Sequence, residues 1–249
     1  MMNGKVVLIT GASGGIGAET ARLMGRHGAN VVLNYRDNAD KADRIAAEIR
    51  KCKKGSAIAV KADVSKMADM EKMMNGILKD FKRIDIIVNN ASSPAKNIPF
   101  ADIRWNDLQR HLDTSLRGPF NTIKCALPHM MKQKSGKIIN VLTAYTLGAP
   151  PAMLSGYISG KYALLGFSRS LASELGAHGV TVNCLSPGMT ETDFIKDLPA
   201  KLKEIAALQT PLKRLARPID IARVILFLSS DASDHITGAN IPVCGGSVM

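Results

Sequence analysis

Two side chains within residues 155–161 have the types and the spacing for proton transfer. Tyr157 and Lys161 are four residues apart, so on a helix they face the same side. An ammonium beside a phenol favours the phenolate, and this lowers the pKa of the phenol from its usual value of about 10. Such a tyrosine can protonate a carbonyl oxygen as the carbon accepts hydride. Tyrosine and lysine are also common on solvated helix surfaces, so the pair needs support from elsewhere in the chain.

The N-terminal part of the chain reads as a strand, a glycine-rich turn and a helix. Residues 5–10 are apolar and rich in β-branched side chains, and after the turn apolar residues recur at helical spacing until Gly28. Such a turn lets a pyrophosphate approach backbone N–H groups at a helix N-terminus, where the dipole favours negative charge. We therefore predict a dinucleotide-binding turn, and a glycine turn that binds nothing is the alternative. The predicted contacts are Gly11, Ser13, Gly14, Gly15, Ile16 and Gly17.

Four motifs, taken in order, resemble the short-chain dehydrogenase/reductase superfamily. They are Thr10-Gly11-x-x-x-Gly15-x-Gly17, Asn89-Asn90-Ala91, Tyr157-x-x-x-Lys161 and Pro187-Gly188. The resemblance covers essentially the whole chain, which looks most like the 3-oxoacyl-[acyl-carrier-protein] reductase group. It implies one Rossmann-type dinucleotide-binding domain over residues 1–249 that reduces a ketone to a secondary alcohol.

Strand-like and helical stretches alternate along the chain. Parallel strands need crossover helices on both faces, so we expect an α/β fold with a doubly wound, seven-stranded parallel sheet. Long helices are predicted at residues 105–131 and 155–178, and residues 190–217, with prolines and scattered charge, are predicted to form a mobile substrate lid. The predicted strands are residues 6–9, 31–34, 57–61, 84–88, 137–142, 180–185 and 241–243.

The end of the second predicted strand bears on the choice of cofactor. An acidic residue there would bond the ribose 2′-hydroxyl and repel a 2′-phosphate, but this chain has Tyr35 and Arg36. Arginine can grip a phosphate with two hydrogen bonds, so we predict NADPH/NADP⁺ rather than NADH. Two observations weigh the other way: Asp37 can neutralise Arg36, and Gly14 stands where many NADP-preferring relatives carry a basic residue.

The resemblance implies further cofactor contacts after the later strands. Asp63 resembles the adenine contact of the family, although an aspartate that caps the helix after Ser65 is an adequate alternative. The implied contacts are Asp63, Val64, Asn89, Asn90, Ala91, Tyr157, Lys161, Pro187, Gly188, Thr190 and Thr192.

The resemblance also assigns four catalytic roles, and two of the four positions depart from the family pattern. Tyr157 would donate the proton, and Lys161 would bind the nicotinamide ribose and lower the pKa of the tyrosine. Thr143 stands at the serine position; it keeps the hydroxyl, while its methyl narrows the pocket. Thr146 or Ser155 is an alternative source of that hydroxyl.

Ser115 stands where the family usually has an asparagine that anchors a water relay. A serine can hold a bridging water there, or it can mark weakened catalysis. His111 and His129 lie nearby, but histidines on a helix surface are usually solvated, so we expect neither to be catalytic.

Composition excludes several functional classes. The chain has 33 Lys+Arg against 21 Asp+Glu, a formal net charge of +12, yet only 4% aromatic residues and no nucleic-acid motif, so no nucleic acid partner is expected. The charge suits an anionic cofactor or an acidic acyl carrier protein, or is simply that of a basic soluble protein. No membrane-spanning run or secretory signal is recognised, which predicts a cytoplasmic protein. Four scattered cysteines without ligand spacing predict reduced thiols and no metal site.

Apolar residues around the expected carbonyl position suit an acyl chain or a hydrophobic ring. We therefore predict reduction of a 3-oxoacyl thioester or a related β-keto substrate, free or carrier-bound. Pro128 and Ser173 replace arginines that carrier-protein reductases often present, so another short-chain ketone or alcohol oxidoreductase is the alternative, and a catalytically weakened nucleotide-binding regulator is a third. The resemblance further implies a homotetramer or homodimer. The apolar residues in question are Ala144, Tyr145, Leu147, Met153, Leu154, Met189, Phe194 and Ile195.

Overall fold

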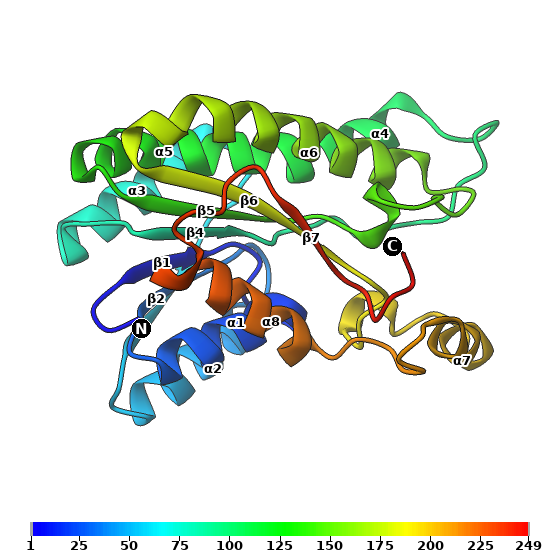
Figure 1. Cartoon of the computed structure of the whole chain (residues 1–249), viewed down its shortest axis with the longest axis horizontal. Helices are drawn as coiled ribbons and strands as arrows, with labels where there is room; N and C mark the ends of the chain where they lie inside the picture. Colours follow the sequence, from blue (N-terminus) through cyan, green and yellow to red (C-terminus); the bar gives the residue numbers. More distant parts are fainter. Residues whose placement is uncertain (1, 249) are drawn as a thin grey trace.

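Seven parallel strands form the central sheet in the order β3-β2-β1-β4-β5-β6-β7 (Figure 1). The structure is a computed structural model that describes residues 2–248. Since every neighbouring pair of strands is parallel, each connection crosses over a face of the sheet, and the predicted doubly wound α/β fold is confirmed. Each strand lies within two residues of its predicted bounds. The strands are β1 (Val6–Ile9), β2 (Asn30–Tyr35), β3 (Ser56–Lys61), β4 (Ile86–Asn89), β5 (Gly136–Val141), β6 (Val180–Pro187) and β7 (Asn240–Val243).

Helices cover both faces of this sheet, as Figure 1 shows. The α-helices are α1 (Gly15–Arg26), α2 (Ala39–Lys51), α3 (Met67–Phe81), α4 (Trp105–Leu112), α5 (Gly118–Gln133), α6 (Ser155–Leu175), α7 (Ala200–Gln209) and α8 (Pro218–Leu228). Shorter helical turns are η1 (Asp113–Arg117), η2 (Ala144–Thr146), η3 (Gly176–His178), η4 (Asp193–Ile195) and η5 (Asp231–Ser233).

The alternation of side chains along β1 divides the core between the two layers. Val7 and Ile9 pack in the cluster that contains buried residues of α1, α2 and α8. Val6 and Leu8 point the other way, into the cluster with α3, α5 and α6. Strands that are buried on both faces have continuous apolar sequences, which is why their positions could be predicted from the sequence. The two helix layers support the edge of the sheet at which β1 and β4 end.

The predicted long helix over residues 105–131 is helical throughout, but it is not a regular α-helix along its whole length. The helix is interrupted by a π-helical turn, η1, between α4 and α5. Pro119 has no N–H to donate to the carbonyl of Ser115 one helical turn earlier, so regular α-helical bonding cannot pass through this point. Turns of this kind occur frequently at functional sites. The predicted helix over 155–178 is confirmed as α6 followed by η3.

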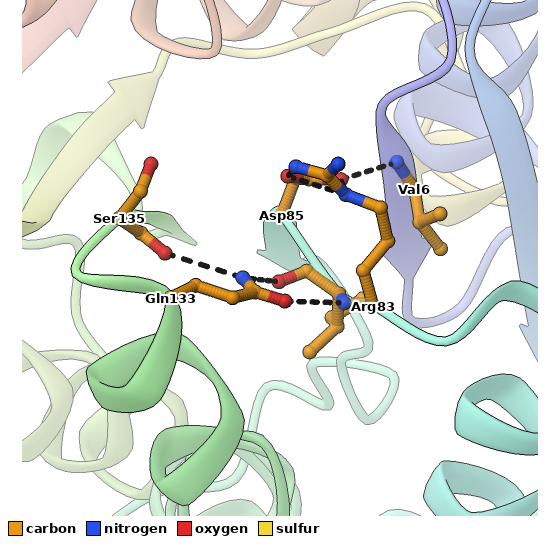
Figure 2. Close-up of polar contacts among 6 residues, drawn as sticks. Val6, Arg83, Asp85, Gln133 and Ser135 are labelled. Carbon is orange, nitrogen blue, oxygen red and sulfur yellow. Dashed lines mark hydrogen bonds and ion pairs between the residues drawn. The ribbon is translucent and has the colours of Figure 1, made fainter.

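Polar contacts at the amino end of β4 set its position beside β1 (Figure 2). Asp85 is buried, and its Oδ2 accepts a hydrogen bond of 2.8 Å from the backbone N–H of Val6 while Arg83 pairs with the same carboxylate. Gln133, at the end of α5, donates through Nε2 to the carbonyl of Ile84 at 2.9 Å and accepts from its N–H at 3.4 Å. These contacts lie at the edge opposite to the glycine turn, so their role is structural.

Residues 190–217 lie outside the regular alternation of strands and helices, as predicted. They contain η4 and α7, which lie beyond the sheet near the end of β7 (Figure 1). The two ends of the segment are joined where Glu191 N–H bonds the carbonyl of Ala216 and Ala216 N–H bonds that of Met189. Its predicted mobility stays a prediction.

Candidate active site

The candidate site residues gather at the carboxyl edge of the sheet. The glycine turn follows β1, Tyr35 ends β2 and Arg36 follows it, Asp63 follows β3, and Asn89 ends β4. Thr143 follows β5, and Pro187 ends β6. Strand order reverses between β1 and β4, and ligands of open α/β sheets bind at such reversals. Parallel topology therefore brings together residues far apart in the chain.

Asn90 holds the glycine turn against β4. Its Nδ2 donates to the carbonyls of Thr10 and Gly11 at 3.0 and 3.1 Å, while Thr10 Oγ1 accepts from the backbone N–H of Asn90 and of Ala91. Gly17 has to lack a side chain, because a Cβ there would lie 2.6 Å from both Asn90 Nδ2 and the Gly11 carbonyl. Gly11 also has a positive φ of 63°, which favours glycine. The turn is thus locked in one shape.

Asn89 belongs to a buried chain of amides beneath the site. Its Nδ2 donates to Asn140 Oδ1 at 2.8 Å, and Asn140 Nδ2 donates to Ser168 Oγ at 2.8 Å. These bonds link β4, β5 and α6, which carries Tyr157 and Lys161. The two bonds therefore connect the centre of the sheet to the helix that covers it.

Arg36 and Asp37 form an exposed ion pair of 2.8 Å at the end of β2. The alternative in which Asp37 neutralises Arg36 is therefore realised in this structure. Asp63 Oδ1 accepts from both the N–H and the hydroxyl of Ser65, at 3.0 and 2.7 Å. Burial raises the pKa of Asp63, but the bonds from Ser65 and the charges of Arg36 and Lys66 outweigh this and lower it overall. Asp63 stays ionised at neutral pH.

Tyr157 and Lys161 share one side of α6, as their spacing predicts. Lys161 is 3% exposed, and its Nζ lies 5.8 Å from the centroid of the Tyr157 ring. The ammonium donates a hydrogen bond to the carbonyl of Val141 at 2.7 Å. Burial lowers the pKa of Lys161 to about 8.

The expected lowering of the tyrosine pKa is wrong for this structure. Although Tyr157 keeps some exposed surface, crowding by protein atoms raises the pKa of Tyr157 to about 12; the Thr143 hydroxyl opposes the rise and Tyr145 adds to it. The Lys161 ammonium, 5.8 Å from the centroid of the Tyr157 ring and bonded to the Val141 carbonyl, does not offset this rise. At neutral pH Tyr157 is accordingly a neutral phenol with a proton to give.

Thr143 is the hydroxyl that lies beside Tyr157. It is buried, and its hydrogen-bonding contact with the phenol lowers the pKa of Tyr157. Thr146 is engaged elsewhere, since its Oγ1 donates to the Thr143 carbonyl at 2.8 Å and lies 3.1 Å from Ser186 Oγ. Ser155 is exposed at the start of α6. Of the three hydroxyls proposed from the sequence, the structure pairs only Thr143 with the tyrosine.

The expectation that His111 is solvated is wrong. Its side chain is buried at 8% exposure, and its ring meets that of Tyr157 edge-on, with 5.9 Å between centroids and planes 77° apart. The face of α4 that carries His111 was expected to lie in water, but it packs against α6. No motif in the sequence indicates that contact. His129 is exposed, as expected. Ser115 is buried in η1 at 1% exposure.

The ring of Phe194 lies beside that of Tyr157. It lies on η4, within the segment predicted to be a lid, and its ring centroid is 6.1 Å from that of Tyr157. Phe194 is itself 49% exposed. Of the apolar residues predicted to surround the substrate carbonyl, Phe194 is thus one that lies next to the Tyr157 ring.

A separate cavity of about 400 Å³ lies beside the glycine turn. Ser13, Gly14, Gly15 and Thr192 line it, together with side chains of α1 and α2. Tyr157 is not among the residues that line it. The remaining contacts predicted for the cofactor, Thr190 and Gly188, are joined by a hydrogen bond of 2.9 Å from Thr190 Oγ1 to the Gly188 carbonyl.

The sequence matches a family model and named relatives along nearly its whole length. The family model described as "Enoyl-(Acyl carrier protein) reductase" matches residues 11–247. The 3-oxoacyl-[acyl-carrier-protein] reductase FabG of Staphylococcus epidermidis is 36% identical over 98% of this chain and 99% of its own length. The chain belongs to the short-chain dehydrogenase/reductase superfamily.

Other members of the short-chain dehydrogenase/reductase superfamily agree in sequence and in fold. The 3-oxoacyl-[acyl-carrier-protein] reductase of Synechocystis is 37% identical over the whole chain and 98% of its own length. The 3-ketoacyl-(acyl-carrier-protein) reductase of Brucella melitensis, solved with NADH, has a TM-score of 0.91 at 31% identity and full coverage of both chains. Levodione reductase has a TM-score of 0.94 at 27% identity, over 99% of this chain and 98% of its own.

The curated relatives are named for 3-oxoacyl reduction, whereas the family model carries the name of an enoyl reductase. A single named protein that aligns over nearly its whole length is a more specific comparison than a model of a whole family. The names of the curated relatives therefore bear more closely on the chemistry than the name of the family model. Within residues 2–248, no helix is long and apolar enough to span a lipid bilayer.

Proposed function

We propose that this chain reduces the keto group of a 3-oxoacyl thioester, or of a related β-keto substrate, to a secondary alcohol with NADPH. The observation that carries the proposal is the neutral phenol of Tyr157, flanked by the Thr143 hydroxyl and the Lys161 ammonium, at the carboxyl edge of a Rossmann-type sheet. Relatives with 36% and 37% identity carry the name of this activity.

The glycine turn fits a dinucleotide. A Cβ on Gly14, the residue just before the N-terminus of α1, would meet no atom within 4 Å, which leaves room for a pyrophosphate. Gly11 and Gly17 are already in close contact with Ala91 and Asn90, so they shape the turn rather than face a ligand. NADPH, when bound, supplies the hydride.

The protein supplies the proton and the polar contacts. Thr143 and Tyr157 both donate hydrogen bonds to the carbonyl oxygen of the substrate, which polarises the carbonyl bond. As the carbon accepts hydride, the oxygen becomes an alkoxide and takes the phenol proton of Tyr157. The nearby charge of Lys161 stabilises the phenolate left behind. The raised pKa of Tyr157 keeps the proton in place until that step.

A Tyr157→Phe variant tests the assignment. It keeps the ring contacts and removes the proton, so ketone reduction is expected to fall by about 10²- to 10⁴-fold while NADPH binding changes little. The assay follows oxidation of NADPH with a short 3-oxoacyl thioester, and Tyr162→Phe, an exposed tyrosine on the same helix, is the matched control. Turnover of Tyr157→Phe at the parent rate refutes the role of the phenol. Binding of NADPH without reduction of any ketone in a broad panel favours the nucleotide-binding regulator.

An acyl carrier protein is the partner that the relatives suggest. Their names specify a carrier-bound substrate, and the net charge of +12 suits an acidic carrier. Pro128 and Ser173 stand where arginines are expected, so carrier contact would fall to the exposed Lys132, Lys134 and Arg169. A lower KM for the carrier-bound than for the free thioester, abolished by addition of salt, is the expected result.

Reduction of a ketone without a carrier is the second candidate. The missing arginines at Pro128 and Ser173 favour it, and Levodione reductase, at a TM-score of 0.94, is named for such a substrate. Equal KM values for free and carrier-bound forms of one substrate would decide for this alternative.

Assembly into a homotetramer or homodimer is also proposed. Phe120 on α5 and Phe167 on α6 contact each other with 6.3 Å between centroids, and Phe120 is 43% exposed on that face. A self-complementary contact across a two-fold axis would bury it. Sedimentation of the protein and of Phe120→Asp should give a smaller species for the variant.

A further inference from the structure

A cavity of about 510 Å³ lies between α3 and α5, which lie together on one face of the sheet (Figure 1). None of the residues assigned to the candidate active site lines it, and it is distinct from the cavity beside the glycine turn. Four of its lining side chains carry atoms that bind soft metal ions. They are Met67 and Met74 from α3 and Cys125 and His129 from α5, called here the Met–Cys–His cluster.

Helical spacing brings these four side chains to the cavity in two pairs. Met67 and Met74 are seven residues apart, so they lie two turns apart on one side of α3. Cys125 and His129 are four residues apart, so they lie one turn apart on one side of α5. Because α3 packs beside α5, the two pairs face the same cavity.

The two pairs meet at the sulfur atoms of Met67 and Cys125, which are 3.8 Å apart. Two sulfur atoms bound to one metal ion at the usual metal–thiolate length of about 2.3 Å lie about 3.8 Å apart in tetrahedral geometry and about 4.0 Å apart in trigonal geometry. The two sulfur atoms are therefore already spaced as ligands of one ion. An S–H···S hydrogen bond has the same spacing, and only metal binding tells the two apart.

The Met–Cys–His cluster has a buried inner side and an open outer side. Met74 is 2% exposed, Met67 and Cys125 are half-buried, and His129 is exposed. An ion can therefore enter from solvent past the imidazole. Methionine has three rotatable side-chain bonds, so Met74 can turn its sulfur toward the ion without movement of the backbone.

The donor types select a soft, singly charged ion. Among residues 2–248, no three His, Cys, Asp or Glu side chains are grouped so that they could hold a metal ion, and those are the ligands that Zn²⁺ and Ca²⁺ require. Thiolate together with thioether sulfur is the ligand set that Cu⁺ prefers. One thiolate also neutralises one Cu⁺, so the bound ion brings no net charge into a half-buried site.

We propose that Met67, Met74, Cys125 and His129 form a binding site for Cu⁺ that joins α3 to α5. The Cys125 thiol loses its proton to water as its sulfur binds the ion, no electron is transferred, and copper remains Cu⁺. The spacing of the cysteines predicted no metal site because two of the four ligands are methionines, which a rule on cysteine spacing does not count. The site goes beyond the proposed function and needs neither the cofactor nor the ketone.

Titration of the whole, reduced protein with Cu⁺ tests the site. Cu⁺ is supplied without oxygen as its coloured complex with bicinchoninate, and the loss of colour measures the Cu⁺ that the protein takes. We expect one tightly bound Cu⁺ per chain and one proton released per ion, because a free thiol is mostly protonated at pH 7. Zn²⁺ in about 100-fold excess should not displace the Cu⁺, since thioethers are not among its usual ligands.

Four variants remove one donor each. Cys125→Ser should weaken Cu⁺ binding by about 100-fold or more, because it removes the thiolate. Met67→Leu, Met74→Leu and His129→Phe should each weaken it by about tenfold, and leucine keeps the volume of methionine without its sulfur. Cys52→Ser removes an exposed cysteine outside the cavity, so it is the matched control and should bind Cu⁺ like the parent.

Thermal unfolding gives a second readout, because an ion that binds only the folded chain stabilises it. One equivalent of Cu⁺ should raise the melting temperature of the parent and of Cys52→Ser but not that of Cys125→Ser. Met67→Leu, in which the rise should be smaller than in the parent, replaces Cys125→Ser if the latter does not fold.

Failure of the parent to take Cu⁺ from bicinchoninate would overturn the site and leave Met67 and Cys125 as an ordinary hydrogen-bonded contact. Loss of binding in Cys52→Ser would place the ion at another thiol and overturn it as well. Equal affinities of the parent, Met67→Leu and Met74→Leu would show that the thioethers are not ligands, which is a third contrary result. Rates of ketone reduction enter none of these outcomes, so the site and the proposed function stand or fall separately.

Discussion

The ammonium of Lys161 donates a hydrogen bond of 2.7 Å to the carbonyl of Val141, the last residue of β5. Among residues 2–248 no carboxylate pairs with it. A lysine at 3% exposure, held by a neutral acceptor, costs the fold stability, and burial lowers its pKa to about 8. Its Nζ lies 5.8 Å from the centroid of the Tyr157 ring, so under the proposed mechanism the charge stabilises the phenolate formed there.

Lys161→Met is expected to abolish ketone reduction and to raise the free energy of unfolding at pH 7 by about 1 to 3 kcal/mol. The folded pKa of about 8 lies below the ordinary value of 10.5, so the unfolded chain binds more protons between these two values and the stability of the parent rises with pH there. The advantage of the variant should therefore be largest below pH 8 and shrink up to about pH 10.5. Chemical denaturation across this range measures it, and Lys134→Met, on the surface, should show no such trend.

Thr143→Val should lower kcat/KM for the ketone by about 10²-fold, because it removes one of two donors to the developing alkoxide while keeping the side-chain shape. Thr143→Ser retains the hydroxyl and should stay within a few-fold of the parent. Steady-state kinetics with NADPH in excess measure both. Equal rates for the valine and serine variants would show that another group polarises the carbonyl.

Phe194→Ala should raise KM for the ketone and lower kcat/KM about fivefold, since an aromatic contact contributes about 1 kcal/mol. The substitution removes the ring that packs against Tyr157 at 6.1 Å between centroids. Steady-state kinetics with varied ketone measure the effect, and Phe227→Ala, at 42% exposure on α8, is the matched control. A fall in NADPH affinity of the same size would instead mean that Phe194 serves the cofactor.

Arg36→Ala should raise KM for NADPH by about tenfold or more and leave KM for NADH nearly unchanged, because only NADPH carries the 2′-phosphate. The exposed pair with Asp37 is weak enough to exchange for a phosphate. Asp37→Asn should therefore lower KM for NADPH. If Arg36→Ala raises KM for NADPH and KM for NADH by the same factor, Arg36 does not recognise the 2′-phosphate.

Asp85→Ala should destabilise the fold by about 1 to 3 kcal/mol without changing KM for either substrate, because it leaves the N–H of Val6 buried and unpaired. Asp85→Asn keeps an acceptor and should be milder. Thermal unfolding measures both, with Asp37→Ala as an exposed control for removal of an ion pair. A change in cofactor affinity would be unexpected, since Asp85 lies at the opposite edge of the sheet from the glycine turn.

The strand pattern and the four motifs were readable from the sequence for a physical reason. Strands buried on both faces leave continuous apolar runs, and glycines such as Gly11 and Gly17 mark places where no side chain fits. The placement of Tyr157 beside Lys161 was readable because the two residues lie one helical turn apart, so local geometry alone puts them on one side.

The burial of His111 and the pKa of Tyr157 could not be predicted from the sequence, because both depend on tertiary packing. His111 was expected in water, but Gly156 and Gly160 let α4 and η1 pack against α6 and bury it against Tyr157. The pKa of Tyr157 depends on burial and on where the Lys161 ammonium points, and the partner of that ammonium is a carbonyl in a different element, β5. Periodicity reports which residues share a helix face; only the packing of elements distant in the chain sets which charges and rings then meet.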